Sequence, residues 1–251
     1  MITVEGLRHR YGTLPVVEDL SFEVGRGRFC ALVGPSGCGK STVLRVLAGL
    51  LVPGEGRATI DGSSTIGRTG QGAYMAQRDL LLPWRRALRN ATVGAEARGA
   101  DRASATAAAA ALFERFGLAG FERAWPHQLS GGMRQRLALL RTFVAGLDVL
   151  LLDEPFGALD ALTRRDLQGW LDELLSTGSH TVVLVTHDVD EALLLADEVL
   201  VLSPRPATIR ARIDSPYPHP RPSSLVVDPD FVQRKAAVLA ALSGSAPPTG
   251  G

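Results

Sequence analysis

The chain has 251 residues, with 27 Lys and Arg against 26 Asp and Glu, so its formal net charge is +1. This balance argues against a nucleic-acid coat or a polybasic membrane anchor, which need clustered excess charge, and we expect no nucleic-acid partner. Hydrophobic residues make up 45% of the chain, as in globular proteins with a large core. The two cysteines cannot form a disulfide framework, and the N-terminus has no signal-peptide pattern. Since the longest apolar runs are far shorter than the ~18 residues of a membrane span, we expect a soluble, intracellular chain.

The residues up to about position 75 predict strands and one helix around a glycine-rich turn. Ile2, Val4 and Leu7 give a rough alternation, as expected for a strand with one buried face. Residues 29–33 (FCALV) are all apolar, which is typical of a strand buried on both faces. The same patterns predict further strands at 16–24, 57–61 and 72–75, and a helix at 41–50 that Pro53 and Gly54 end.

From about residue 78 to residue 147, Ala and Leu rise and β-branched residues become fewer, so we expect an inserted helical part, with a helix at 103–116. Strands and helices then alternate, with strands at 149–152, 181–186 and 198–202 and helices at 163–176 and 189–196. This alternation predicts an α/β fold with a mainly parallel core sheet. Proline is frequent after Ser203, which indicates a thin tail.

Residues 34–41 (GPSGCGKS) fit the pattern G-x-x-x-x-G-K-[ST] and lie between a predicted strand and a predicted helix. Glycines let backbone N–H groups surround phosphate oxygens, and the helix N-terminus adds partial positive charge. Lys40 supplies a point charge to the β- and γ-phosphates, and the Ser41 hydroxyl can ligate Mg²⁺. A plain glycine-rich turn capped by Ser41 is the alternative.

The apolar run 149–152 ends at two acidic residues, Asp153 and Glu154. Ligands of parallel α/β sheets bind at the edge where such strands end. We expect Asp153 to hold Mg²⁺ through water and Glu154 to polarise an attacking water as general base. A solvated acidic loop or a helix cap is the alternative for this pair.

Residues 129–136 (LSGGMRQR) narrow the choice among nucleotide hydrolases and kinases, because they closely resemble the signature of ATP-binding cassette (ABC) ATPases. Further elements resembling that family appear in order at Tyr11, Gln77, Asp160 and His187. The resemblance covers about residues 1–205. It implies a P-loop NTPase (RecA-like) core at about 1–77 and 145–205, with an antiparallel β N-terminal subdomain. It also implies an α-helical subdomain at about 78–144, which leaves 206–251 as a short Pro-rich tail.

The resemblance also implies that ATP and Mg²⁺ are the ligands, and it assigns residues to each. Adenine stacks on Tyr11, and the phosphates bind at Gly34, Pro35, Ser36, Gly37, Cys38, Gly39, Lys40, Ser41 and Thr42. The resemblance further implies a head-to-tail dimer, expected to be a homodimer. In it, ATP bound to one copy also contacts Ser130, Gly131, Gly132 and Asp160 of the other copy. The implied Mg²⁺ ligands are Ser41, Gln77 and Asp153, and the implied catalytic residues are Glu154, His187 and Gln77.

Two local features bear on the kind of ABC ATPase. Met133 stands where the family most often has Gln, but Ser130 and Gly132 are kept, so we expect the signature to function. Residues 82–84 (Leu82, Pro83 and Trp84), followed by Asn90, resemble the subfamily that imports nitrate, sulfonates, taurine and thiamine-precursor pyrimidines. That resemblance implies a separate permease docked near residues 82–84, an extracytoplasmic solute-binding protein, and a position at the cytoplasmic face of the cell membrane.

Alternatives stay open at this level. A soluble ABC ATPase of DNA repair or translation is the second hypothesis, although the sequence has neither a long coiled-coil insertion nor a second cassette. A P-loop kinase is the third, and it leaves the LSGG segment and His187 unexplained. Tyr11, Trp84 and His187 can each also be read as ordinary core side chains.

Overall fold

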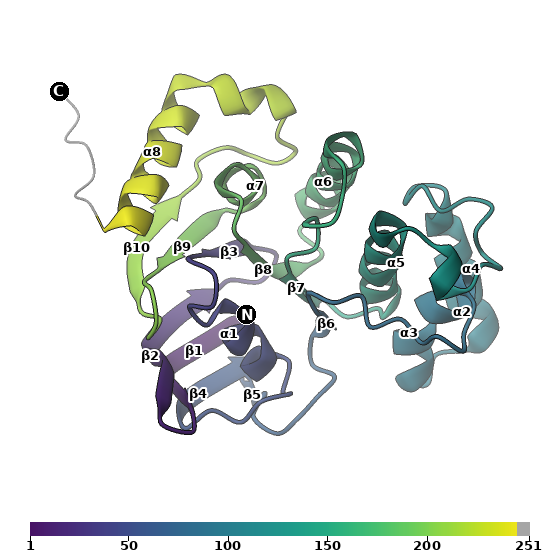
Figure 1. The fold of residues 1–251 in the computed structure, drawn as a ribbon, viewed down its shortest axis with the longest axis horizontal. Helices are drawn as coiled ribbons and strands as arrows, with labels where there is room; N and C mark the ends of the chain where they lie inside the picture. Colours follow the sequence, from purple (N-terminus) through teal and green to yellow (C-terminus); the bar gives the residue numbers. More distant parts are fainter. Residues whose placement is uncertain (245–251) are drawn as a thin grey trace.

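The computed structural model describes residues 1–244, apart from the side chain of Leu175, and its strands form two sheets (Figure 1). The larger sheet has the order β10-β9-β3-β8-β7-β6. Its strands are β3 (Phe29–Val33), β6 (Ala73–Met75), β7 (Val149–Asp153), β8 (Thr181–Thr186), β9 (Glu198–Leu202) and β10 (Ile209–Asp214). All neighbouring strands in it are parallel except β10 and β9, which confirms the predicted α/β fold with a mainly parallel sheet.

The smaller sheet is antiparallel, in the order β2-β1-β4-β5. Its strands are β1 (Ile2–Tyr11), β2 (Leu14–Val24), β4 (Glu55–Ile60) and β5 (Ser63–Ser64). Its buried side chains pack with helix α1 (Lys40–Leu47) and with one face of the larger sheet, so α1 lies between the two sheets. This packing fixes the loop that precedes α1.

Strand β3 is buried on both faces, as its uninterrupted apolar sequence predicts. Phe29, Ala31 and Val33 join the core on the side of helices α6 (Ala161–Ser176) and α7 (Val189–Leu195), whereas Cys30 and Leu32 join the core around α1. The alternation of side chains along a strand explains how one five-residue segment connects the two cores.

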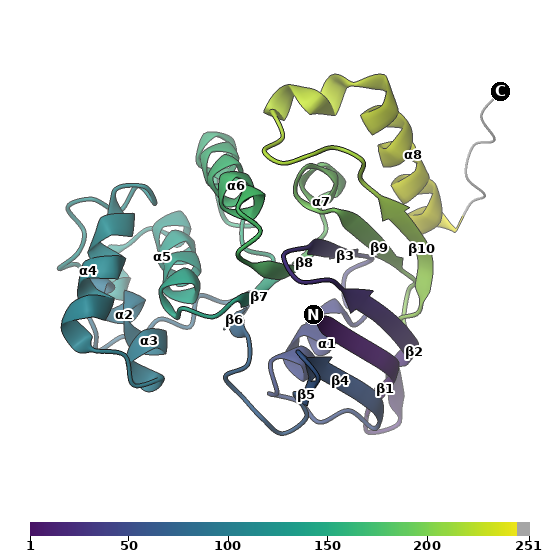
Figure 2. The ribbon, with the colours of Figure 1, turned by 180° about the vertical axis from the view of Figure 1, so that it is seen from behind.

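Between β6 and β7 the chain forms the predicted helical insertion, which lies to one side of the sheets in both Figure 1 and Figure 2. Its elements are α2 (Ala87–Ala91), α3 (Val93–Ala97), α4 (Arg102–Phe113), a 3₁₀ helix (Pro126–Gln128) and α5 (Gly131–Val144). Helix α4 begins where the Asp101 carboxylate accepts a hydrogen bond from the Ser104 N–H, a regular N-cap.

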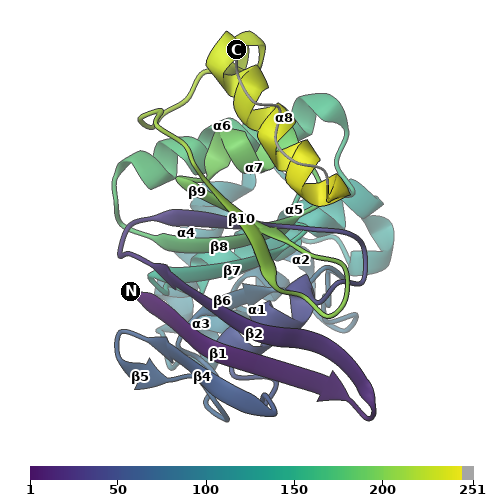
Figure 3. The same cartoon turned by 90° about the vertical axis from the view of Figure 1, so that its left-hand side faces the viewer.

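The expectation of a thin tail from residue 206 is wrong for the part that the structure describes. Strand β10 pairs with β9, and after a 3₁₀ helix (Ser223–Val227) helix α8 (Pro229–Ser243) crosses the end of the molecule in Figure 3. Phe231 and Val238 of α8 are fully buried. Residues 245–251 of the predicted tail lie outside the described residues. Within residues 1–244, no helix is both long enough and apolar enough to cross a membrane.

Candidate functional site

The loop between β3 and α1 curves around the side chain of Lys40. Gly39 has a φ of 128°, and a Cβ there would lie 2.9 Å from the Val16 carbonyl oxygen, so only glycine fits. Lys40 is buried, and its Nζ donates to the carbonyl oxygens of Gly34 (2.6 Å) and Pro35 (3.0 Å). The ammonium therefore lies inside the curve of the loop.

This loop forms one wall of a cavity of about 330 Å³. The cavity is lined by Tyr11, Leu14, Val16, Ser36, Gly37, Gly39, Lys40, Ser41, Thr42, Gln77, Glu154 and Arg205. Of the residues predicted to bind phosphates, Gly34, Pro35 and Cys38 do not line it, and the Cys38 side chain is buried in the core around α1. Tyr11 is 46% exposed, so its reading as a core side chain is wrong.

Two oxygen-bearing side chains predicted to hold Mg²⁺ contact each other beside the loop. The Ser41 hydroxyl donates to Asp153 Oδ1 at 3.0 Å, and the Tyr74 hydroxyl donates to Oδ2 at 3.4 Å. Burial raises the pKa of Asp153, while the hydrogen bonds from Ser41 and Tyr74 oppose that rise. A hydroxyl and a carboxylate are the hard oxygen donors that Mg²⁺ prefers, so the pair fits that ion. Among the described residues no group of three or more His, Cys, Asp or Glu side chains could hold a metal, so phosphates and water would complete the shell.

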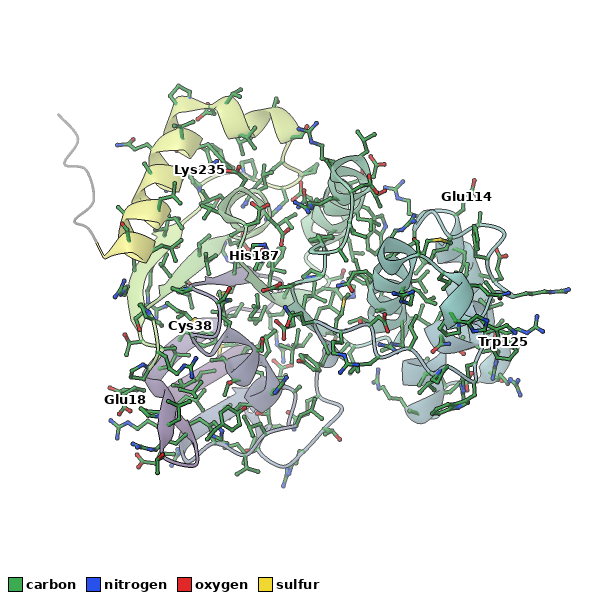
Figure 4. All side chains as sticks on the ribbon, viewed as in Figure 1. Glu18, Cys38, Glu114, Trp125, His187 and Lys235 are labelled. Carbon is green, nitrogen blue, oxygen red and sulfur yellow. The ribbon has the colours of Figure 1, made fainter. Side chains whose placement is uncertain are left out.

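Gln77 and His187 converge on Glu154 rather than on the Ser41–Asp153 pair. Gln77 Nε2 donates to Glu154 Oε2 at 3.1 Å, and His187 Nδ1 lies 3.5 Å from the same oxygen. The His187 side chain is 63% exposed, so its reading as a core histidine is wrong; Figure 4 labels it on the segment after β8. The structure thus brings together all three residues predicted to be catalytic.

The backbone at Glu154 is strained. Its φ is 50°, in the left-handed region that costs a non-glycine residue on the order of 1 kcal/mol. Two hydrogen bonds hold it there, from the Glu154 N–H to the Val185 oxygen (2.8 Å) and from Gln135 Nε2 to the Glu154 oxygen (3.2 Å). Glu154 thus lines the cavity from a backbone position that these hydrogen bonds fix.

The predicted signature residues do not reach this cavity within one chain. Ser130 is exposed and caps α5, where its Oγ accepts a hydrogen bond from the Met133 N–H at 3.2 Å. Asp160 is exposed and accepts from the Thr163 N–H at 3.0 Å at the start of α6, and hydrogen bonds from that turn lower its pKa. Gly131 and Gly132 belong to the first turn of α5. The candidate site therefore has two separate parts in one chain.

Several polar residues near the site were missed by sequence reasoning. Tyr74 and Arg205 were not singled out, and Arg205 lies in a segment read as leading into a tail. Gln135 belongs to the predicted signature at 129–136, but its hydrogen bond to the Glu154 backbone was not predicted. Glu191 is buried next to the His187 segment, accepts a hydrogen bond from Gln168 Nε2 (3.3 Å), and has a pKa raised to about 7 by burial. The acidic residues at the start of α7 were an available signal for Glu191.

Trp84 is 70% exposed, so it is not a core aromatic. The turn that carries it is held by the buried Asn90, whose side chain accepts from the Leu82 N–H (2.7 Å) and donates to the carbonyl oxygens of Leu82 (3.1 Å) and Arg85 (2.7 Å). Beside it lies a shallow cavity of about 510 Å³, lined by Trp84, Arg85, Arg86, Arg89, Glu96, Arg102 and Trp125. Glu96 pairs with Arg85 and Arg89, and Arg86 lies 5.1 Å from the ring of Trp125, which Figure 4 labels. The surface is basic and aromatic.

A glycine-rich loop that joins a buried strand to a helix, next to an acidic strand end of a parallel sheet, defines a P-loop nucleotide-binding protein. Residues 17–157 match the ABC transporter family. The chain is 46% identical to an aliphatic sulfonates import ATP-binding protein, SsuB of Mycobacterium sp. (strain MCS), over 88% of this chain and 87% of that one. It is 37% identical to a taurine import ATP-binding protein, TauB of Yersinia pestis bv. Antiqua (strain Antiqua), over 95% and 96%.

Among solved structures, the chain is similar to the ATP-binding cassette MJ0796, reported as a dimer in a post-hydrolysis state bound to ADP and Pi. The TM-score is 0.77 at 25% identity, over 85% of this chain and 98% of that one. The chain therefore belongs to the ABC transporter family and is an ATP-binding protein and ATPase of that family.

Proposed function

We propose that the chain is the ATP-hydrolysing subunit of an importer for a sulfonated solute such as an alkanesulfonate or taurine. Two relatives whose names state import of these solutes match at least 87% of their own length, which supports this class over nitrate or pyrimidines. The observation that carries the hydrolytic role is the convergence of Gln77 and His187 on one oxygen of Glu154.

The roles that we assign follow from these positions. Lys40 and the N–H groups of the loop hold the phosphates, and Tyr11, which also lines the cavity, provides an aromatic face for the adenine. Ser41 and Asp153 would hold Mg²⁺, which neutralises phosphate charge when bound. Glu154 accepts a proton from the attacking water, and Gln77 and His187 keep its carboxylate oriented.

The second part of the site, Ser130 to Gly132 with Asp160, acts on ATP held by another copy of the chain. A fourteen-residue helix begins at this segment, and its N-terminus carries a partial positive charge that suits a phosphate. The dimeric cassette MJ0796 supports an arrangement of two copies. ATP bound between the copies then holds them together, and hydrolysis releases them.

The permease docks on the surface around Leu82, Pro83 and Trp84, and an extracytoplasmic solute-binding protein completes the complex. The exposed indole and the excess of arginine beside it favour a cytoplasmic permease segment that carries an apolar residue and a carboxylate. This partnership keeps the chain at the cytoplasmic face of the membrane.

The test is transport itself. The tagged full chain is isolated from membranes with its co-purifying membrane-spanning protein, and the complex is reconstituted in vesicles with a matching solute-binding protein. We expect ATP-dependent uptake of labelled taurine or an alkanesulfonate, and no uptake with the Glu154→Gln chain. ATP hydrolysis by a chain that never associates with a membrane protein would instead support a soluble ABC ATPase.

A further inference from the structure

The loop between β9 and β10 lies against the phosphate-binding loop, although 168 positions separate Arg205 from Gly37 in the sequence. Arg205 Nε donates a hydrogen bond to the Gly37 carbonyl oxygen at 3.1 Å. The Arg205 side chain lines the same cavity as Lys40, Ser41 and Glu154. A second cation therefore faces the candidate nucleotide site from a distant part of the chain.

The position of this loop is held by its backbone. The Ala207 N–H donates to the Val16 carbonyl at 2.8 Å, and the Glu18 N–H donates to the Ala207 carbonyl at 3.0 Å. Ser203 Oγ lies 2.8 and 2.9 Å from the carbonyl oxygens of Pro204 and Pro206, and it accepts from the Thr208 N–H at 2.9 Å. Arg205 thus projects from a loop that is tied to β2, one wall of the cavity, before any ligand binds.

Among the described residues, most N–H groups of the Arg205 guanidinium have no hydrogen-bond acceptor. Within residues 1–244, Nε is the one nitrogen of Arg205 with a hydrogen-bond acceptor, and the side chain has no carboxylate partner. By contrast, Lys40 Nζ is bonded to Gly34 and Pro35, at the other end of the loop. A guanidinium presents a planar fork of N–H groups that matches phosphate oxygens in pairs.

We propose that Arg205 is a nucleotide-binding residue whose guanidinium contacts the phosphates of the bound nucleotide from the Gly37 side of the loop. This proposal rests on the proposed function in one respect: it takes ATP as the ligand that binds in this cavity. The phosphates then bind between two cations, Lys40 from the loop itself and Arg205 from the β9–β10 loop. Nucleotide binding is thereby linked to the C-terminal strand pair.

The test compares Arg205→Gln and Arg205→Lys with Arg57→Gln in the full chain. Arg57 is an exposed arginine of β4 that does not line the cavity, so it controls for the loss of one charge. Binding of ATP, ADP and adenosine is measured by calorimetry, and ATPase rates are measured over a range of ATP concentrations. We expect Arg205→Gln to weaken ATP and ADP binding by about ten- to a hundredfold, as for lost hydrogen bonds to a charged group. Arg205→Lys should recover part of the affinity, and Arg57→Gln should bind as the wild type does.

The KM for ATP should rise in Arg205→Gln while kcat at saturating ATP stays within about threefold, since we assign Arg205 to binding. If Arg205→Gln weakened the binding of adenosine as much as the binding of ATP, the contact with phosphates would be overturned. An unchanged ATP affinity of Arg205→Gln would overturn the whole proposal. Lys40→Ala in the same assay distinguishes a failure of the Arg205 proposal from a failure of the phosphate-site assignment in the proposed function. If Lys40→Ala also binds normally, the phosphate site itself is misassigned, whereas loss of binding in Lys40→Ala alone counts only against Arg205. An unchanged unfolding temperature of the nucleotide-free Arg205→Gln chain checks that its fold is intact.

Discussion

The nucleotide cavity and the C-terminal segment (residues 206–244) are built in opposite ways. Half of the residues that line the cavity come from one short run after β3, namely Ser36, Gly37 and residues 39–42, and Glu154 follows directly after β7. The C-terminal segment is instead held by His219 and Arg221, which contact Asp172 and Asp197 from distant parts of the chain. The nucleotide cavity can therefore be predicted from local sequence patterns, whereas the C-terminal segment depends on side-chain pairs that form only in the folded chain.

The contacts of the C-terminal segment centre on Arg221, whose side chain is 1% exposed. Its Nη1 donates to the carbonyl oxygens of Leu193 (3.1 Å), Leu194 (3.2 Å) and Ala196 (2.8 Å), which satisfies carbonyl groups at the end of α7. Asp172 of α6 accepts hydrogen bonds from the Arg221 N–H and from His219. We call Asp172, Asp197, His219 and Arg221 the C-terminal clasp.

The largest expected effect lies in the cavity. Glu154→Gln keeps the size of the side chain and removes its ability to accept a proton, so ATP turnover should fall by about 10²- to 10⁴-fold. ATP affinity should be retained, and an ATP-bound dimer should accumulate in size-exclusion chromatography. Glu23→Gln, an exposed change on β2, is the matched control. Because the change does not touch the clasp, the unfolding temperature should hardly move. Normal turnover in Glu154→Gln would remove this residue from the role of base.

The second expected effect tests the clasp. Arg221→Met keeps an unbranched side chain but leaves the carbonyl groups of α7 and the carboxylate of Asp197 without this partner, so the free energy of unfolding should fall by about 3 kcal/mol. Arg210→Met on β10 removes an exposed arginine and should cost less than about 1 kcal/mol. Urea unfolding measures both.

The same Arg221→Met chain should bind ADP with nearly wild-type affinity below its unfolding transition. A lower free energy of unfolding together with a retained ADP affinity would show that the clasp contributes to stability and not to nucleotide binding. A chain with wild-type stability would show that the clasp contributes little, and a large loss of ADP affinity would mean that the two regions are coupled.

Sequence reasoning reached the parallel sheet, the phosphate loop and the Glu154 strand end because each rests on neighbouring residues of defined type. It missed β10 and α8, since the many prolines around them resemble a linker. Signals for α8 were nevertheless present: Asp228 caps it, Pro229 opens it, and Gly244 follows it with a left-handed φ of 75°. Arg205 and Arg221 could not be predicted, because their partners, Gly37 and the end of α7, are brought to them only by tertiary packing.

The smallest expected effect is a pH dependence of stability that comes from His219. Its hydrogen bond to Asp172 and then the nearby Asp197 carboxylate, 3.3 Å from Nε2, raise its pKa, although burial and the charge of Arg221 oppose the rise. Arg28, which pairs with Asp197, is the other cation nearby. A histidine whose pKa is raised on folding stabilises the protein fully below its unfolded pKa of about 6.5, and this contribution is lost as pH rises through the folded pKa.

His219→Gln should therefore lower the free energy of unfolding more at pH 5.5 than at pH 8.5, and urea unfolding at the two pH values measures the difference. His127→Gln, on the exposed 3₁₀ helix of the insertion, is the control and should show no such difference. An equal loss at both pH values would mean that His219 acts in the clasp through its shape and not through its charge. In that case Arg221 would be the cation on which the clasp depends. The clasp would then differ even more from the cavity, because a single residue that no local pattern marks would hold it.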